Sequence, residues 1–436
     1  MAFNTGLSGI QAASKDLEVI GNNIANSATT GFKSSRAEFA DVYAVGAFGG
    51  GQNAIGSGVR LSRVQQNFGQ GNLSFTNNVL DLAISGSGMF VLNEQGANVY
   101  SRAGSFSIDN EGFLVNAFNQ NLVGNLADNN GVIGQTQGNL RLDTSNVEPF
   151  ATTLAEIGVN LYANATPPSI AWSGGSSPAT DTYNNVTSST VYDSLGNSHV
   201  LTMYFIHADA TTVGGDNDSS PVNTDNQWYV AFQIDNQDVP AIGGATNAAN
   251  LYRANFATDG TFVGVEDTAG NPLANNLIPL TYAPGNGANT MNLNIDLSDS
   301  TQFGSPFSNM SSTQNGYPAG QINGLDIDEN GVLFAHYTNG QDRAMGQLLL
   351  ANFPNLDGLQ QLGNTSWAET AASGQALLGI PGAANLGLIQ SGALEGSNVD
   401  ITEQLIGLIG AQRNFQANAQ TIRTADAVTQ TMINIR

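Results

Sequence analysis

The sequence contains no cysteine, only 12 lysine and arginine residues, three histidines and no long apolar run. Without a thiol the chain can form no disulfide and offers no thiol nucleophile. Against 35 acidic residues the few basic ones leave a net charge of −23, and no basic patch exists to neutralise phosphates, so we expect no nucleic-acid partner. No stretch approaches the ~20 apolar residues of a membrane span, and we expect no membrane span. The first residues also lack the features of a cleaved secretory signal, so we expect any export to remove no such peptide.

Recognisable catalytic and cofactor motifs are missing as well. There is no H-E-x-x-H helix, no G-x-S-x-G turn and no phosphate-binding G-x-x-x-x-G-K-[ST] loop. Residues 326–331 imitate half of a calcium loop, but Tyr337 stands where a bidentate glutamate is needed, so a hairpin turn is the better interpretation. His199 and His207 lie ~26 Å apart along an extended strand, too far to share a metal. We therefore predict no enzyme, no metal site and no cofactor.

What the chain does contain is length, glycine and small polar residues. Its 436 residues predict two or three domains, and 41% apolar residues suffice for their cores. Charged residues are only 11%, and they are unevenly spread. Residues 1–63 carry +1 and residues 399–436 carry zero, which leaves about −24 on the middle. Neutral ends suit close packing of many copies, whereas an acidic middle stays soluble and repels other acidic surfaces.

The N-terminal residues predict a helix over 4–26. Its apolar residues recur at spacings of four and three, which is typical of one narrow seam along a helix that packs lengthwise against another. This predicted seam consists of Phe3, Leu7, Ile10, Leu17 and Ile24.

The C-terminal residues repeat the pattern over a longer stretch, in which 36 helical residues would run ~50 Å. Asp400 followed by Glu403 predicts a capped start. The seam predicted here consists of Ile401, Leu405, Leu408, Phe415, Ile422 and Ile433.

Neither seam can be satisfied by its own helix, and glycine-rich sequence separates both helices from the middle. We interpret the two ends as subunit-interface helices that pair with each other and with the helices of neighbouring copies. Docking of each helix on a globular core of its own chain is the alternative.

Segments near both ends resemble the signature sequences of the bacterial flagellar axial proteins. The C-terminal segment comprises residues 395–400 and 411–418, and the N-terminal one lies within residues 22–39, so the two occur in the family's order. The N-terminal signature residues are Asn22, Asn23, Ile24, Asn26, Gly31, Phe32 and Lys33.

The middle of the chain predicts β structure. Apolar and aromatic residues alternate with polar ones in runs such as 199–206 and 227–234. Residues 108–114 and 327–333 share a hairpin pattern, in which Gly112 and Gly331 supply the positive φ of the turn. The predicted fold class is mixed α and β and multidomain, with long N- and C-terminal helices forming a coiled-coil-like domain and mainly antiparallel β inner and outer domains.

The resemblance also indicates the domain division. Residues 80–90 and 100–106 resemble the inner β domain shared by rod and hook proteins, and residues 190–199 resemble the outer domain of the hook protein family. The linker stretch at 41–63 is longer and richer in glycine than in the shortest family members. The predicted parts are paired terminal helices at 1–30 and 392–436, linkers at 31–70 and 364–391, an inner β domain at 71–149 and 284–363, and an inserted outer β domain at 150–283.

The resemblance implies a structural subunit of the flagellar hook, a flexible curved tube that acts as a universal joint and transmits motor torque from rod to filament. The implied location is an extracellular appendage. The implied partners are other copies of the chain, the distal rod protein, the hook cap protein, the hook–filament junction protein and the flagellar type III export apparatus. Two alternatives stay open, which are a distal rod protein and, from a different class, a surface adhesin or glycan-binding protein.

Overall fold

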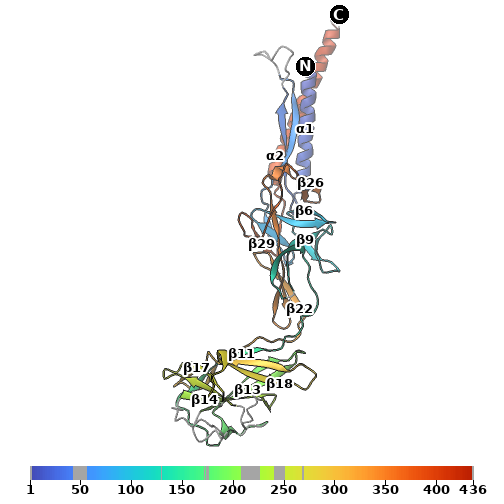
Figure 1. Ribbon diagram of the computed structural model, residues 1–436. Coiled ribbons are helices and arrows are strands. Elements are labelled where there is room, and N and C mark those ends of the chain that lie inside the picture. The colour runs from blue at the N-terminus through green and yellow to red at the C-terminus, as the bar shows by residue number, and fades with distance from the viewer. Residues whose placement is uncertain are drawn as a thin grey trace. The chain divides into compact units, whose positions relative to one another are not determined.

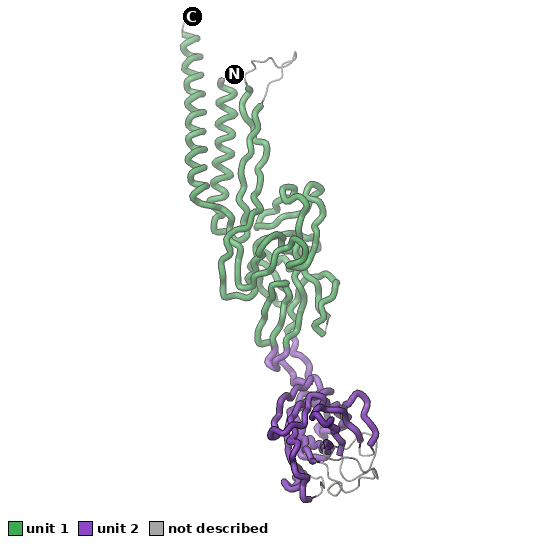
Figure 2. Tube along the Cα trace, turned by 90° about the vertical axis from the view of Figure 1, so that its left-hand side faces the viewer, with its two compact units in different colours: residues 1–144, 322–336, 342–436 green, residues 145–321, 337–341 purple. Residues whose placement is uncertain are grey.

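The computed structural model describes residues 2–42, 56–128, 130–170, 172, 176–207, 226–239, 251–267 and 270–434. Most of the predicted glycine-rich linker, residues 43–55, therefore lies outside the described residues. The chain divides into two compact units (Figure 2). Unit 1 comprises residues 1–144, 322–336 and 342–436, and unit 2 comprises residues 145–321 and 337–341. The described chain is mostly β, with one helix near each end and several antiparallel sheets, so the mixed, multidomain class is confirmed.

The two predicted terminal helices are present as α1 (Ala2–Ala25) and α2 (Ile401–Asn434), and they run side by side in unit 1 (Figures 1 and 2). The carboxylate Oδ1 of Asp400 accepts hydrogen bonds from the backbone N–H of Thr402 at 2.8 Å and of Glu403 at 3.2 Å. This is the predicted cap, since it satisfies two amides that have no partner within the helix.

Unit 1 is built on a 13-stranded sheet, whose main path runs β22-β23-β24-β9-β5-β6-β27-β26. The N-terminal strands β9, β5 and β6 lie between two groups of strands from the C-terminal half, so neither half can complete the sheet alone. The strands are β5 (Met89–Glu94), β6 (Ala97–Ser101), β7 (Phe106–Ile108), β8 (Leu114–Asn116), β9 (Asn121–Ala127), β10 (Ile133–Asn139), β22 (Ile322–Ile327), β23 (Val332–Tyr337), β24 (Asp342–Leu348), β25 (Leu350–Asn352), β26 (Gln360–Gly363), β27 (Ser366–Ala368) and β28 (Leu377–Gly379).

Three two-stranded ribbons connect this sheet with the helices. The hairpin of β1 (Ser35–Asp41) and β2 (Val59–Gln66) follows α1. β3 (Leu73–Phe75) pairs with β30 (Ala393–Glu395), and β4 (Leu82–Ser85) pairs with β29 (Leu388–Ser391). The last two ribbons join segments more than 300 residues apart in sequence, immediately before α2.

Unit 2 contains two sheets that share one hydrophobic core. The six-stranded sheet is an antiparallel meander of β12 (Asn185–Tyr192), β13 (Ser198–His207), β14 (Gln227–Ile234), β15 (Gln237–Asp238), β16 (Leu251–Phe256) and β17 (Phe262–Glu266). The five-stranded sheet contains β11 (Leu154–Tyr162), β18 (Leu277–Tyr282), β19 (Met291–Asp296), β20 (Thr301–Phe303) and β21 (Ser308–Gln314). Both predicted alternating runs are strands, as β13 and β14, and their alternate apolar side chains, such as Met203 and Phe232, are buried in the core.

The extent of unit 2 follows from strand pairing. β11 pairs in parallel with β19 and β20 and in antiparallel orientation with β21. Residues 284–321 therefore pack within unit 2, whereas the sequence places them in the inner β domain. Composition does not mark this difference, because prolines and turn residues continue through the whole region.

One type of turn recurs in both units. The predicted hairpins are present, and Gly112 and Gly331 adopt positive φ of 88° and 73°. In each turn an aspartate accepts the backbone N–H of the residue four positions later, as Asp109 does from Phe113 at 2.8 Å and Asp328 from Val332 at 2.7 Å in unit 1, and Asp193 from Asn197 at 2.8 Å in unit 2. The calcium-like segment 326–331 is thus the β22–β23 hairpin, in which the Asp328 carboxylate already bonds the backbone.

Candidate subunit interface

The contact between α1 and α2 uses small residues on α1. A Cβ added to Gly6 would lie 2.9 Å from Cγ1 of Ile422, and one added to Gly9 would lie 2.5 Å from Oδ1 of Asn418. Further along, the Asn23 amide donates to Oε1 of Gln404 at 3.0 Å. Residue numbers rise along α1 as they fall along α2, so the helices are antiparallel. The glycines matter because only residues without a side chain let the two backbones approach this closely.

The predicted seam of α1 lies beside this contact. The residues of α1 that are buried are Gly6, Ala13, Ile20 and Asn23. The seam from Phe3 to Ile24 has the same spacing but is displaced by one residue, which is about 100° around the helix. Phe3 and Leu7 are 53% and 42% exposed, while Ile10, Leu17 and Ile24 are half-buried. Pairing of α1 with α2 therefore leaves large apolar side chains of α1 exposed or only half-buried.

The predicted seam of α2 is divided in the same way. Leu408 and Ile422 are half-buried on the side that faces α1, and Phe415 is 38% exposed at its edge. Ile401, Leu405 and Ile433 are exposed. Ile406, Ile409, Val428 and Met432 are exposed too, and the sequence interpretation missed them. The sequence does contain a sign of this wider surface. Residues 405–409 are apolar at nearly every position, so they cover more of the helix circumference than one seam with alternating spacings of four and three.

α2 is also longer than α1, with 34 residues against 24. Its C-terminal end continues past the N-terminal end of α1 (Figures 1 and 2). Val428, Met432 and Ile433 belong to this last part of α2, where exposed apolar side chains have no α1 residues beside them.

The N-terminal signature forms the turn between α1 and β1. Asn23 is almost fully buried, and its amide accepts from the backbone of Ser35 at 2.9 Å and donates to it at 2.7 Å. Asn26 donates to the carbonyl oxygen of Asn22 at 3.0 Å, and its own Oδ1 accepts from Thr29 at 3.2 Å. The two bonds to Ser35 tie the end of α1 to the first residue of β1, and the bonds of Asn26 hold the turn between them.

Gly31 is held by backbone on both sides. It has φ of +70°, its N–H donates to the carbonyl oxygen of Glu395 at 2.8 Å, and an added Cβ would lie 2.5 Å from the amide nitrogen of Ala103. Both the positive φ and the close backbone favour glycine.

A buried charge cluster joins the two ends of the chain to the β part of unit 1. Nζ of Lys33 lies 2.6 Å from Oε1 of Glu395, and Nη1 of Arg102 lies 2.9 Å from Oε2. Lys33 also donates to the carbonyl oxygen of Gly69, and Arg102 to that of Gly86. Burial lowers the pKa of Lys33, which the charge of Glu395 partly offsets. The sequence singled out Lys33 and Glu395 as signature positions but did not indicate that they bind each other.

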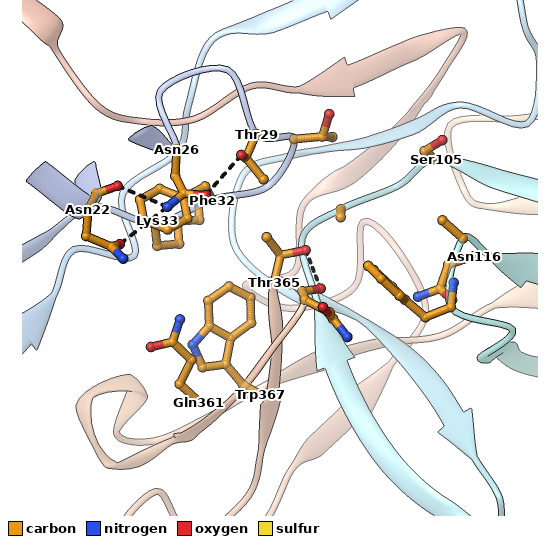
Figure 3. A pocket seen from close by; sticks show the side chains of 15 residues that line it. Asn22, Asn26, Thr29, Phe32, Lys33, Ser105, Asn116, Gln361, Thr365 and Trp367 are labelled. Carbon is orange, nitrogen blue, oxygen red and sulfur yellow. Dashed lines mark hydrogen bonds between the residues drawn. The ribbon is translucent and has the colours of Figure 1, made fainter. Parts of the chain in front are cut away.

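The signature also lines a pocket of about 470 Å³ in unit 1 (Figure 3). Asn22, Asn26 and Phe32 line it together with Phe118 and Thr365. Its lining is amide, hydroxyl and aromatic, and its one ionisable side chain, Lys33, is bound to Glu395. Among the described residues, no group of three acidic, histidine or cysteine side chains is placed to hold a metal. Such a pocket suits uncharged protein groups better than acid–base chemistry.

Four known families match segments at both ends and in the middle of the chain. Residues 3–33 match the family described as flagella basal body rod protein, and residues 390–435 match the C-terminal family of flagellar basal body rod FlgEFG proteins. Residues 83–167 match the flagellar hook protein FlgE/F/G D1 domain, and residues 160–317 match the flagellar basal body protein FlaE D2 domain. The fold and the terminal signatures thus define a subunit of the rod-and-hook class.

Full-length relatives identify the family within this class. The chain is 36% identical to the flagellar hook protein FlgE of Salmonella typhimurium over the full length of both. It is 31% identical to that of Treponema pallidum, covering 99% of this chain and 98% of the relative. The chain belongs to the flagellar hook protein family and is a structural subunit of the hook. These matches do not favour the distal rod protein or the adhesin.

A solved structure agrees with this fold. The crystal structure of the Helicobacter pylori flagellar hook protein FlgE2 superimposes with a TM-score of 0.52 at 15% identity, over 74% of this chain and all of that one. No helix among the described residues is long and apolar enough to span a membrane.

Proposed function

We propose that this hook subunit polymerises through the outer faces of the α1–α2 pair, which acts as a coiled-coil-like inner domain formed by residues 1–30 and 392–436. The observation that carries the proposal is the row of exposed apolar side chains on both helices, among them Phe3, Leu7, Leu405 and Ile406. Large apolar side chains left exposed along both helices indicate an interaction site. Burial of each such side chain contributes on the order of 1.5–3 kcal/mol.

The glycines of α1 explain how one helix pair can serve two contacts. Gly6 and Gly9 bring α2 close within the chain, so the larger residues one position further round the helix stay available to neighbours. Phe3, Leu7, Ile10, Leu17 and Ile24 then form a subunit interface on α1. Of the residues predicted on α2, Leu408 and Ile422 pack toward α1. The corresponding outer interface on α2 comprises Ile401, Leu405, Phe415 and Ile433, extended by Ile406, Ile409, Val428 and Met432.

The remaining parts of the chain fit a tube that bends while it transmits torque. Residues 31–70, which include the β1–β2 hairpin, lead to the inner β domain, whereas residues 364–391 contribute β27 and β28 to its sheet and do not act as a linker. The sequence of the inserted outer domain is rich in small polar residues. Contacts among such residues exchange at little cost, so inner contacts keep the register of the subunits while outer domains slide. The partners of this assembly are other copies, the distal rod, hook cap and hook–filament junction proteins, and the type III export apparatus that delivers the chain to the extracellular appendage.

The test is a charge placed on the outer face of α2. Ile406 is 67% exposed, so Ile406→Asp leaves the contact with α1 intact but puts a carboxylate into the proposed interface. We expect a soluble monomer with the wild-type far-UV circular dichroism spectrum and no tubes by electron microscopy. Ile406→Leu, which keeps volume and polarity, is the matched control and should polymerise. Tubes of normal abundance from Ile406→Asp would refute the proposed interface.

A further inference from the structure

Unit 2 contains a buried histidine held between two carboxylates. His199 lies on β13 and is only 7% exposed. Its Nδ1 is 2.6 Å from Oδ2 of Asp235, and its Nε2 is 3.2 Å from Oδ2 of Asp193. Asp193 belongs to the turn between β12 and β13, and Asp235 to the turn between β14 and β15. The imidazole thus bridges two separate turns of the six-stranded sheet.

The geometry determines the charge of the ring. Ionised carboxylates only accept hydrogen bonds, so both ring nitrogens must donate, and only the imidazolium does this. Burial lowers the pKa of His199, but the hydrogen bonds and charges of Asp235 and Asp193 outweigh it and raise the pKa above the ordinary value near 6.5. Burial likewise opposes ionisation of Asp193, yet hydrogen bonds from Asn286, Asn197 and His199 hold the pKa of that carboxyl well below its usual range.

The other groups around the ring offer no second cation. Tyr282 on β18 packs edge-on against His199 and donates its hydroxyl to Asp235 at 3.3 Å. Asn286 donates to Asp193 at 2.7 Å. Arg253 is the one lysine or arginine in the sequence of unit 2, and it lies against Glu266 at 3.6 Å. The proton on His199 is therefore the positive charge that compensates the two carboxylates.

The turn held by His199 packs on the segments through which the chain enters and leaves unit 2. These segments, residues 145–152 and 315–321, are called the stem here; they pair at Phe150 and Tyr317. Gly196 in the turn has φ of +83°, and an added Cβ would lie 2.9 Å from Cβ of Pro149. Tyr192 and Thr152 exchange hydrogen bonds of 2.8 and 2.9 Å. The stem therefore rests on the same turn that the imidazolium fixes.

We propose that His199 is a proton-operated latch for the stem of unit 2. The imidazolium ties the β12–β13 turn to the β14–β15 turn and so keeps residues 193–197 packed on the stem. When His199 loses this proton, one ring nitrogen becomes a hydrogen-bond acceptor facing a carboxylate, which cannot donate to it. The β12–β13 turn then separates from the β14–β15 turn. Because the pKa is raised in the folded protein, the stabilisation is complete below the ordinary pKa near 6.5 and is lost as the pH rises through the folded value.

The test follows the proton and the stem in the full-length protein. With only three histidines in the chain, NMR of histidine-labelled protein gives the titration of His199. Hydrogen exchange of peptides covering 145–152 and 315–321, corrected for intrinsic exchange rates, reports the stem. We expect His199 to titrate above 6.5 and stem exchange to rise at least about tenfold across that titration, since a 1.4 kcal/mol change in opening free energy is a factor of ten.

Variants separate the latch from a general effect of pH. His199→Gln can bridge only one carboxylate, so its stem should exchange fast at every pH. Asp259→Asn neutralises an exposed carboxylate in the β16–β17 turn of unit 2 and should keep the wild-type transition. Asp235→Asn, a conservative change for use if His199→Gln does not fold, should move the transition to lower pH. A His199 pKa at or below 6.5, stem exchange independent of pH, or an unchanged midpoint in Asp235→Asn would each overturn the proposal.

Discussion

At the scale of single residues, Glu395 is the buried anion on which two buried cations of unit 1 depend. Its carboxylate is fully buried and serves Lys33, Arg102 and the backbone amide of Gly71 at 2.6, 2.9 and 2.9 Å. Two cations thus share one anion away from water. Removing one partner of a buried ion pair is costly because the remaining charge stays buried without compensation.

Glu395→Gln tests this cost. The variant leaves both cations buried, and we expect the free energy of unfolding of unit 1 to fall by about 3–5 kcal/mol. Hydrogen exchange of β4 and β30 in the full-length protein measures the loss. Glu38→Gln is the control, because Glu38 pairs with Arg63 in a half-exposed site where removal changes little. Equal effects of the two substitutions would contradict the role of burial.

The residue scale also shows where sequence reasoning reached its limit. Each signature position was recognisable from its own end of the chain, and the caps and turns could be predicted because Asp400, Gly112 and Gly331 act on neighbouring residues. The Lys33–Glu395 contact spans 362 residues, and the Asp235–His199 contact joins the β14–β15 turn to β13. No local spacing indicates such contacts, because they depend on how the strands between them pair.

At the scale of elements, both helices were predictable from periodicity, but the side on which they meet was not. The seam was predicted from the positions of large apolar side chains. The contact with α2 instead lies where α1 has glycine and alanine. Close approach then depends on the absence of side chains at Gly6 and Gly9. The same rule explains why part of the predicted seam, such as Phe3 and Leu7, stays exposed beside the contact.

Adding side chains at these positions should separate the helices. In Gly6→Leu/Gly9→Leu the new side chains meet Ile422 and Asn418, and we expect overpacking of about 1–3 kcal/mol to outweigh the better helix propensity of leucine. The helical circular dichroism signal of the full-length protein should therefore be lost at a lower temperature. Gly21→Leu is the matched control, since a Cβ there has no neighbour within 4 Å, and it should raise the signal. The same melting temperature in both variants would count against the close contact.

At the scale of the whole molecule, charge is concentrated in unit 2. Its sequence has 15 acidic residues and one lysine or arginine, Arg253, which is buried. Copies of such a unit repel one another when they are brought together in a polymer. Salt reduces this repulsion, because the Debye length falls from about 30 Å at 0.01 M to about 8 Å at 0.15 M.

Assembly should therefore depend on ionic strength. We expect the critical concentration for tube formation, measured by sedimentation, to fall severalfold between about 0.01 and 0.15 M NaCl as screening sets in. A variant with Glu156→Gln, Asp181→Asn and Asp259→Asn, three exposed positions of unit 2, should show a weaker dependence. A critical concentration insensitive to salt in the unmodified protein would rule out this effect of unit 2.

The position of the Lys33–Glu395 pair also constrains the order in which parts of the chain can fold. The N-terminal segment has to wait for a partner that is synthesised more than 360 residues later, so contacts inside unit 2 can form first and the helix pair last. Any surface built on the α1–α2 pair is then absent until the final stretch of chain is free to fold. On the interface proposed above, a partly emerged chain lacks the surface by which it would join a growing polymer.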